Sequence, residues 1–162
     1  MVHVLNINPY AATHDKLTGL PNSFLFYDRV NVAIASDERT TSRSAVALIK
    51  IRELELIRRT QGDSIGDILL LRVTERLSKS LREGDTIGKL DDCDFGILFT
   101  QLSSKDCIFS LTSRIKHIVS EPYHINKATL DISLDIGLSI YPDDGINAHI
   151  LARHAFNDLL DF

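Results

Sequence analysis

The chain has only two cysteines among its 162 residues, and neither belongs to a pattern that binds metal or builds a disulfide framework. Cys93 and Cys107 form no Cys-x-x-Cys pair and no metal-type spacing with histidine, which favours reduced thiols in a cytoplasmic protein. No apolar run approaches the roughly 20 residues of a membrane span, and the amino terminus lacks the basic start and apolar stretch of a signal peptide. We therefore expect a cytoplasmic chain with no direct membrane insertion.

Positively charged residues are also fewer than negatively charged ones. Lys and Arg number 18 against 22 Asp and Glu, which gives a formal net charge of −4. Such a chain is not attracted to nucleic acid in general, so any anionic ligand would have to be bound by a local cluster. With 44% hydrophobic residues the length suits one well-buried core and is too short for two ordinary domains. We predict one domain over residues 14–162, preceded by a linker or leading arm over residues 1–13.

An acidic hairpin is the stretch in which we expect chemistry. Two short apolar-rich runs, Thr86–Leu90 and Phe95–Phe99, have the composition of strands. The segment that joins them is too polar to be buried and consists of Asp91, Asp92, Cys93 and Asp94. Three carboxylates and one thiol are therefore predicted at a single exposed tip.

Two motifs resemble the GGDEF domain family, whose members condense two GTP molecules into cyclic di-GMP. The first is the hairpin turn, where Phe95 keeps its place but Asp91–Asp94 replace the Gly-Gly-Asp/Glu-Glu part of the signature. The second is the family's entry motif Asp-x-Leu-Thr-Gly-Leu-Pro-Asn, which residues 15–22 match at all seven defined positions. The resemblance covers residues 14–162. It implies an α/β fold with a ferredoxin-like core, related to nucleotidyl cyclases, in which helices flank a central, mostly antiparallel sheet.

Several positions that carry catalytic residues in the family hold other side chains here. Lys50 stands where the resemblance places the first metal-binding aspartate, and Arg52 replaces the second acid. Arg58 replaces the guanine-reading asparagine, and Cys93 replaces the metal-binding acid of the hairpin. A cyclase of this type needs carboxylates that hold Mg²⁺ and a turn without side chains beside the triphosphate. We therefore expect a degenerate domain that is not an enzyme and carries no cofactor and no metal.

The charged residues around these positions have more than one interpretation. The resemblance implies that Asp67 helps to hold a guanine edge, whereas its place in the first turn of a predicted helix favours a structural carboxylate over exposed amides. Arg58 and Arg59 could attract phosphate, but a double arginine beside glutamates is more typical of a solvated face. The acids of the hairpin could bind Ca²⁺ or Mg²⁺, although no loop supplies the remaining oxygens. We expect instead that Lys50 neutralises Asp92 or Asp94.

One ligand-binding pattern of the family is intact. Arg82-Glu83-Gly84-Asp85 matches its inhibitory Arg-x-x-Asp site for cyclic di-GMP, and Arg114 falls where the resemblance implies a further arginine. Arginine can donate two parallel bonds to guanine, and a carboxylate can accept from the other edge of the base. The structural alternative is an ion pair between Arg82 and Asp85 at the end of a helix, worth a few tenths of a kcal/mol.

Hydrophobic periodicity predicts helices and strands in the order helix, strand, helix, hairpin, helix, strand, helix. The elements outside the hairpin are a helix that begins at Phe24 after a cap at Asn22 or Ser23, a strand over Ser44–Ile51, helices over Ser64–Leu81 and Lys105–Val119, a strand over Ala128–Tyr141, and a helix over Leu151–Leu160.

Three functions remain open. The first is a non-catalytic regulatory or interaction module in cyclic di-GMP signalling, tethered to a partner such as an EAL or sensor domain. The second is a receptor for cyclic di-GMP, and the third is an active diguanylate cyclase. The strand and turn over residues 136–145 resemble family proteins that continue into an EAL domain, and the family's basic tail is absent. We therefore expect a domain trimmed from a longer protein, and a homodimer is a further alternative.

Overall fold

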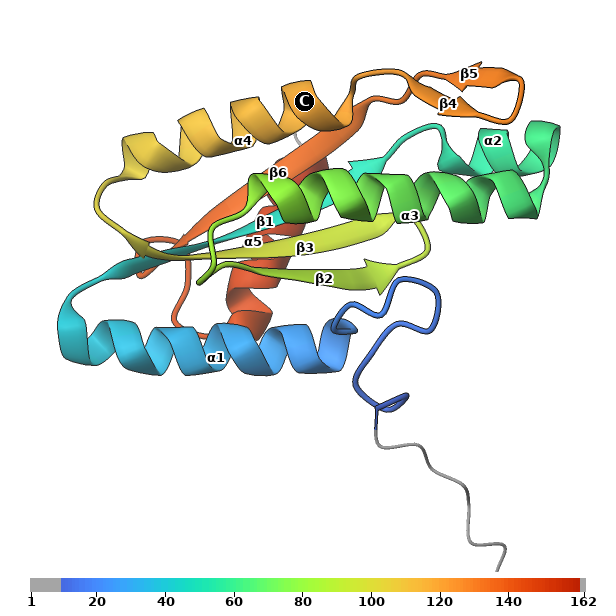
Figure 1. Cartoon of the computed structure of the whole chain (residues 1–162). Coiled ribbons are helices and arrows are strands. Elements are labelled where there is room, and N and C mark those ends of the chain that lie inside the picture. The colour runs from blue at the N-terminus through green and yellow to red at the C-terminus, as the bar shows by residue number, and fades with distance from the viewer. Residues whose placement is uncertain (1–9, 161–162) are drawn as a thin grey trace, which may run out of the picture.

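The central feature of the computed structural model, which describes residues 10–160, is a four-stranded antiparallel sheet with helices on both faces (Figure 1). The strands lie in the order β2, β3, β1, β6, and a separate two-stranded hairpin pairs β4 with β5. This architecture confirms the predicted α/β class with an antiparallel sheet. The elements are α1 (Ser23–Thr40), β1 (Arg43–Ile51), α2 (Leu54–Gln61), α3 (Asp63–Ser80), β2 (Thr86–Asp91), β3 (Asp94–Leu102), α4 (Lys105–Val119), β4 (Tyr123–Ile125), β5 (Ala128–Leu130), β6 (Leu134–Tyr141) and α5 (Ala148–Leu160).

The sheet separates two hydrophobic layers. Strand β1 lies between β3 and β6, and alternate side chains of a strand point to opposite faces. Ala47 and Ile49 belong to the layer under α3 and α4, whereas Val46 and Leu48 belong to the layer under α1 and α5. Because both faces are covered, β1 is an almost continuous apolar run. Among residues 10–160, no helix is both long and apolar enough to cross a membrane.

Two glycines allow α1 to approach the sheet closely. Gly88 of β2 lies directly opposite Gly96 of β3, and the fully buried ring of Phe26 covers both. A Cβ atom at Gly88 would lie 2.9 Å from Cδ1 of Phe26, and one at Gly96 would lie 2.8 Å from Cζ. The ring therefore fills a depression that only glycine can leave open, and it positions the start of α1 beside the β2–β3 hairpin.

Helix α5 lies closely against β6. A Cβ atom at Gly137 would lie 1.9 Å from the carbonyl oxygen of Ala155. The Asp158 carboxylate accepts a hydrogen bond from the Leu138 amide at 2.9 Å, and the buried Ser139 hydroxyl donates to the Leu151 carbonyl at 2.7 Å. The last described helix is thus fixed to the edge strand by backbone contact as well as by side chains.

The structure corrects one predicted strand and adds two short elements, α2 and β4, that were not predicted. The strand expected over Ala128–Tyr141 is interrupted, because the Glu53 carboxylate accepts hydrogen bonds from the Ser133 amide at 2.8 and 3.0 Å and diverts the chain. Residues 128–130 turn back onto β4, and β6 begins only at Leu134. The expected cap of α1 is confirmed, since the Asn22 side chain accepts from the Leu25 amide at 3.1 Å.

Residues 10–13 pack onto the loop that follows them. The Tyr10 hydroxyl donates to the Gly19 carbonyl at 3.1 Å, and the Asn22 side chain donates to the Ala12 carbonyl at 3.0 Å. The rest of the expected leading arm, residues 1–9, lies outside the described residues.

Candidate functional site

The entry loop, the α2–α3 junction and the β2–β3 hairpin surround a cavity of about 520 Å³, which we call the hairpin pocket. Its lining includes Asp15, Asn22, Arg58, Asp67, Lys89 and Asp92. The pocket therefore gathers residues from the entry motif, from the segment around Arg58 and from the acidic hairpin, whereas Lys50, Arg52 and the Arg-x-x-Asp pattern do not line it.

The entry motif forms a closed loop against β2. The Asp15 carboxylate accepts hydrogen bonds from the amide and the hydroxyl of Thr18, at 2.9 and 2.7 Å, and the Asp15 amide donates to the Leu20 carbonyl at 2.7 Å. Gly19 adopts φ +73°, a conformation that glycine tolerates without strain. The Lys89 amide donates to the Pro21 carbonyl at 2.9 Å, so the loop continues the edge of the sheet and forms one wall of the pocket.

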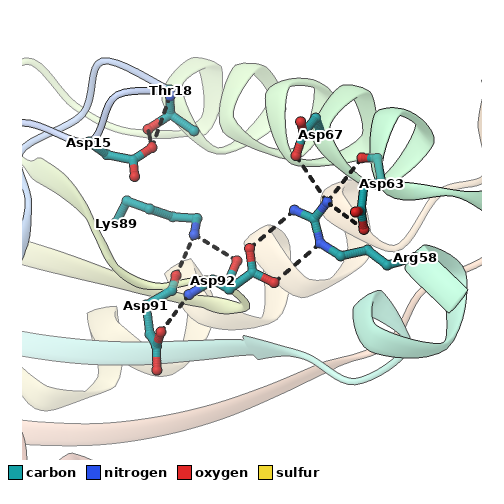
Figure 2. Close-up of polar contacts among 8 residues, drawn as sticks. All are labelled: Asp15, Thr18, Arg58, Asp63, Asp67, Lys89, Asp91 and Asp92. Atoms are coloured by element: carbon teal, nitrogen blue, oxygen red, sulfur yellow. Dashed lines mark hydrogen bonds and ion pairs between the residues drawn. The ribbon is translucent and has the colours of Figure 1, made fainter.

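The Arg58 guanidinium occupies the centre of this site. Figure 2 shows it between α3 on one side and the hairpin tip on the other. It donates to the Asp67 carboxylate at 2.9 Å and to the Asp63 carbonyl at 3.0 Å. It also donates two bonds to the Asp92 carboxylate, at 3.2 and 3.1 Å, in the forked geometry that is strongest for arginine. The Arg58 side chain is only 16% exposed, so the expectation of a solvated arginine was wrong.

The charges around Arg58 stabilise its ionised form. Burial alone would lower the pKa of Arg58, but the hydrogen bonds and charges of Asp67 and Asp92 outweigh it and raise the pKa above its ordinary value. The expectation that Asp67 serves the first turn of α3 was also wrong. The helix begins at Asp63, which is the acid of its first turn, and Asp67 lies one turn further on and accepts from Arg58.

Gly66 makes room for this arrangement. A Cβ atom at this position would lie 2.6 Å from Cγ of Arg58, so the arginine side chain passes directly over the α3 backbone. In this chain Gly66 permits the contact between Arg58 and α3.

A second cation, Lys89, lies inside the hairpin turn. Its ammonium donates to the Asp92 carbonyl at 2.6 Å and to the Asp91 carbonyl, and the residue is only 6% exposed. Burial lowers the pKa of Lys89, although the nearby carboxylates of Asp15, Asp92 and Asp91 act in the opposite direction. Sequence analysis missed this residue. The one feature of the sequence that could have indicated it is a lysine within the apolar-rich run Thr86–Leu90.

Lys50 does not neutralise the hairpin acids in the way we expected. It lies directly opposite Asp94 in the β1–β3 register, yet among residues 10–160 it forms no direct ion pair with Asp94 or with Asp92. Asp92 is bound by Arg58 instead. Burial raises the pKa of Asp94, and the charge of Lys50 offsets this only in part.

The two other replaced positions have structural partners. The Cys93 thiol donates to the Asp94 carboxylate at 3.8 Å, and burial together with the Asp94 charge raises the pKa of the thiol. Arg52 forms an ion pair with Asp135 at 2.6 Å, at the start of β6.

These residues do not fit a hard cation at the family's metal positions. Mg²⁺ and Ca²⁺ take six or more oxygen ligands, whereas Lys50 offers an ammonium and Cys93 a protonated thiol. The Asp92 carboxylate already accepts two bonds from Arg58. In the described part of the chain, no group of three or more His, Cys, Asp or Glu residues is arranged to hold a metal ion.

Replacing Arg58 tests the contribution of this pocket to stability. Arg58→Met keeps the aliphatic stem but leaves Asp67 and Asp92 without their shared cation. We expect a loss of about 1–2 kcal/mol, because both acids are partly exposed and water compensates some of the lost bonds. Urea denaturation measures this loss as a change in the free energy of unfolding. The matched control is the exposed neighbour in Arg59→Met, which should change stability by less than about 0.5 kcal/mol, and equal losses would contradict the role of Arg58.

Asp94 gives a pH-dependent prediction. Folding raises the pKa of Asp94 above its ordinary value of 3.8, so ionising this carboxylate costs stability. The cost develops as the pH rises from the ordinary pKa of the unfolded chain to the higher pKa of the folded protein, and this pH range is the window of the effect. Asp94→Asn should therefore raise the free energy of unfolding at neutral pH and leave it almost unchanged at pH values well below the window. Denaturation at both pH values checks this, and a variant that is less stable at neutral pH would contradict it.

The Arg-x-x-Asp pattern lies at the other end of α3 and forms the ion pair given above as the structural alternative. The Asp85 side chain is 1% exposed, and its carboxylate accepts from the Arg82 guanidinium at 3.0 and 3.2 Å and from the Thr100 amide at 3.3 Å. Arg82 is 47% exposed and lines a separate groove of about 520 Å³. Arg114 donates to the Ser80 carbonyl at 2.9 Å, at the end of the same helix.

The sequence matches the family model described as "Diguanylate cyclase, GGDEF domain" over residues 12–161. It is 34% identical over 144 residues to the bifunctional diguanylate cyclase/cyclic di-GMP phosphodiesterase MucR of Pseudomonas aeruginosa, covering 89% of this chain and 21% of that protein. Diguanylate cyclase TpbB of the same species is 28% identical over 135 residues, covering 83% of this chain and 31% of TpbB. The chain thus spans about a fifth to a third of the length of these two relatives.

Solved structures agree with this match. A sensory box/GGDEF family protein from Caulobacter crescentus superposes with a TM-score of 0.87 at 26% identity, covering 91% of this chain and 96% of that one. The GGDEF domain of TpbB from Pseudomonas aeruginosa gives the same TM-score and identity, covering 91% and 86% of the two chains.

Proposed function

This chain belongs to the GGDEF domain family, and from that premise we propose that it is a catalytically inactive regulatory or interaction module in cyclic di-GMP signalling. The observation that carries the proposal is the Arg58 guanidinium, which lies inside the hairpin pocket and binds Asp67 and Asp92. A guanine base entering this pocket would have to displace a cation that already satisfies two carboxylates. Breaking this pair without replacing it would leave the largely enclosed Arg58 guanidinium, which is 16% exposed, without its charged partners.

The sign of the charge at the hairpin tip also opposes GTP. Asp91 and Asp92 lie where the family has glycines, beside the expected path of the triphosphate. Two like charges at 4 Å repel by about 4 kcal/mol at an effective dielectric of 20. Lys50 and Cys93 do not supply the carboxylates that would hold a metal against this repulsion. The enclosed Arg58 and the acidic tip therefore both support the proposal that the pocket does not carry out the cyclase reaction.

The regulatory role that we propose is exerted on a tethered partner such as an EAL domain. It is supported by the small share of each relative that this chain matches, and by a relative that is named a cyclic di-GMP phosphodiesterase, NbdA of Pseudomonas aeruginosa, at 29% identity. Free cysteines at positions 93 and 107 suit a cytoplasmic setting, where thiols stay reduced.

The catalytic half of the proposal is tested with GTP and either Mg²⁺ or Mn²⁺, followed by chromatography for cyclic di-GMP. We expect no product from this protein, with the full-length diguanylate cyclase TpbB assayed in parallel as the positive control. Product that accumulates with time would overturn the proposal. The regulatory half is tested in the intact parent protein by comparing the activity of the partner domain before and after Arg58→Met. An unchanged activity would contradict regulation through the hairpin pocket.

A second candidate function is binding of cyclic di-GMP at Arg82, Asp85 and Arg114. The half-exposed guanidinium of Arg82 at the edge of an open groove favours it, because this cation is not enclosed as Arg58 is. The enclosed carboxylate of Asp85 would have to exchange its present bonds for those of a guanine edge.

As a receptor, the protein should lose most of its affinity for cyclic di-GMP in Arg82→Ala. A charged hydrogen bond is worth roughly 1.5–3 kcal/mol, which corresponds to a loss of about tenfold or more. Asp91→Gly, at the hairpin tip, is the matched control and should bind almost as the wild type does. Calorimetric titration at one salt concentration compares the three proteins, and circular dichroism confirms that Arg82→Ala is folded. Equal losses in the two variants, or binding that survives Arg82→Ala, would exclude the site.

A further inference from the structure

A second, smaller cavity of about 240 Å³ lies between α1 and α5, and we call it the α1–α5 cavity. Its apolar wall includes Leu48 of β1, Leu90 of β2, and Phe156 and Leu159 of α5. Leu48 belongs to the hydrophobic layer under α1 and α5, whereas Arg58 and Asp67 of the hairpin pocket lie beside α3. The two cavities share only a wall formed by β2, so the α1–α5 cavity is a separate space.

Opposite charges line one end of this cavity without meeting. Lys50 and Asp94 are register partners on β1 and β3, so their side chains point to the same face of the sheet. Lys50 is exposed at the mouth of the cavity and, among the described residues, has no ion-pair or hydrogen-bond partner in the protein, while the only side chain that bonds Asp94 is the weak donor Cys93 at 3.8 Å. A second carboxylate, Asp91, lines the same end. The half-buried Asp94 carboxylate has a raised pKa because burial is not compensated by a close cation.

The charges and the apolar wall of the α1–α5 cavity indicate which kind of molecule would fit it. An ammonium and a carboxylate that face one cavity but do not touch can each be paired by a molecule that carries an ammonium and a carboxylate on the same carbon atom. The apolar wall calls for a hydrocarbon body attached to that charged end. The volume is below the roughly 300 Å³ at which drug-sized clefts begin, so the cavity suits a small molecule rather than a nucleotide.

We propose that the α1–α5 cavity binds a small zwitterion with an apolar side chain, namely an apolar α-amino acid. Its carboxylate contacts the Lys50 ammonium, its ammonium contacts the Asp94 carboxylate, and its side chain packs among Leu48, Leu90 and Leu159. The occupied site connects the end of α5 to the base of the hairpin. The domain would then respond to the concentration of a metabolite that is unrelated to guanine nucleotides, a property independent of the proposed loss of cyclase activity.

Calorimetric titration of the wild-type protein with L-leucine and L-phenylalanine tests the proposal. We expect binding of at least one of them, and at least tenfold weaker binding of three analogues: isoamylamine, which lacks the carboxylate, 4-methylpentanoate, which lacks the ammonium, and glycine, which lacks the apolar body. Failure of both amino acids to bind folded protein at millimolar concentration would overturn the proposal. Equal binding of isoamylamine would also overturn it, since a simple cation site would then suffice.

Two variants locate the site. Lys50→Met and Asp94→Asn should each weaken binding of the amino acid at least tenfold. Lys16→Met is the matched control, because Lys16 lines the hairpin pocket and not the α1–α5 cavity, and it should bind as the wild type does. Binding that is unaffected by both cavity variants would show that the amino acid binds elsewhere and would contradict the assignment. Thermal unfolding of each variant without ligand confirms that the proteins compared are folded.

Discussion

Replacing Phe26 with alanine is expected to lower the free energy of unfolding by about 3–5 kcal/mol, the range measured for fully buried aromatic residues. The ring is fully buried and fills the depression above Gly88 and Gly96, so its removal leaves a cavity that a rigid sheet cannot close. Natural domains are stable by about 5–15 kcal/mol, so this one change removes a large part of the total. Urea denaturation followed by circular dichroism measures the loss, and a loss below about 1 kcal/mol would contradict the packing described.

A double-mutant cycle separates the glycine contact from the general effect of a cavity. Gly96→Ala places a methyl group 2.8 Å from the Phe26 ring and should cost about 1–3 kcal/mol in the wild-type background. In the Phe26→Ala background the remaining close atom is Cδ1 of Leu90 at 3.0 Å, the end of a side chain that can turn into the vacated space, so the cost should largely disappear. Additive losses would show that the two residues do not act on each other.

The second large effect is expected for Gly137→Ala. The added methyl group would lie 1.9 Å from the carbonyl oxygen of Ala155 and 2.7 Å from the amide nitrogen of Leu159. Both atoms belong to the backbone of α5, so no rotamer change relieves the overlap and the helix itself must move. We expect a loss of about 3 kcal/mol or more, at the upper end of overpacking effects.

Hydrogen exchange shows where that loss arises. Amides of α5 should exchange faster in Gly137→Ala, because displacing the helix also breaks the bonds from Leu138 to Asp158 and from Ser139 to Leu151. The control is Gly84→Ala, where the nearest atom to the added methyl group is the Thr100 hydroxyl oxygen at 3.3 Å and no backbone atom is close, so stability should change far less than in Gly137→Ala. Equal melting temperatures for the wild type and Gly137→Ala would contradict close packing of α5.

Much of the fold could be predicted because its elements carry a strong local period. Helix α4 has the predicted bounds, Lys105–Val119, and β1 differs from its prediction by one residue. The interrupted strand could not be predicted, because the break depends on Glu53, which is 80 residues away from Ser133. The apolar alternation of Leu130, Ile132 and Leu134 continues through the break, since all three remain buried, and so the pattern conceals it.

The site was less predictable than the fold, for a similar reason. The sequence shows which residues are charged, but the partner of a long arginine depends on elements that are distant in the chain. Arg58 reaches Asp92, 34 residues further on, only because α2 and the hairpin meet in space. By contrast, the pair of Arg82 and Asp85 lies within one turn of chain, and the structural alternative given for it matches the observed geometry.

The bond between Arg58 and Asp92 constrains the order in which this chain can change. Replacing Arg58 by asparagine alone leaves the Asp92 carboxylate beside Asp91 without its cation. Replacing Asp92 by glycine alone leaves the arginine inside the pocket with one partner fewer. Each single change therefore lowers stability, whereas changing both residues leaves only Asp67 without its cation. Under the proposed function, a return to the family's residues at these two positions would therefore pass through a less stable intermediate, whichever of the two changes first.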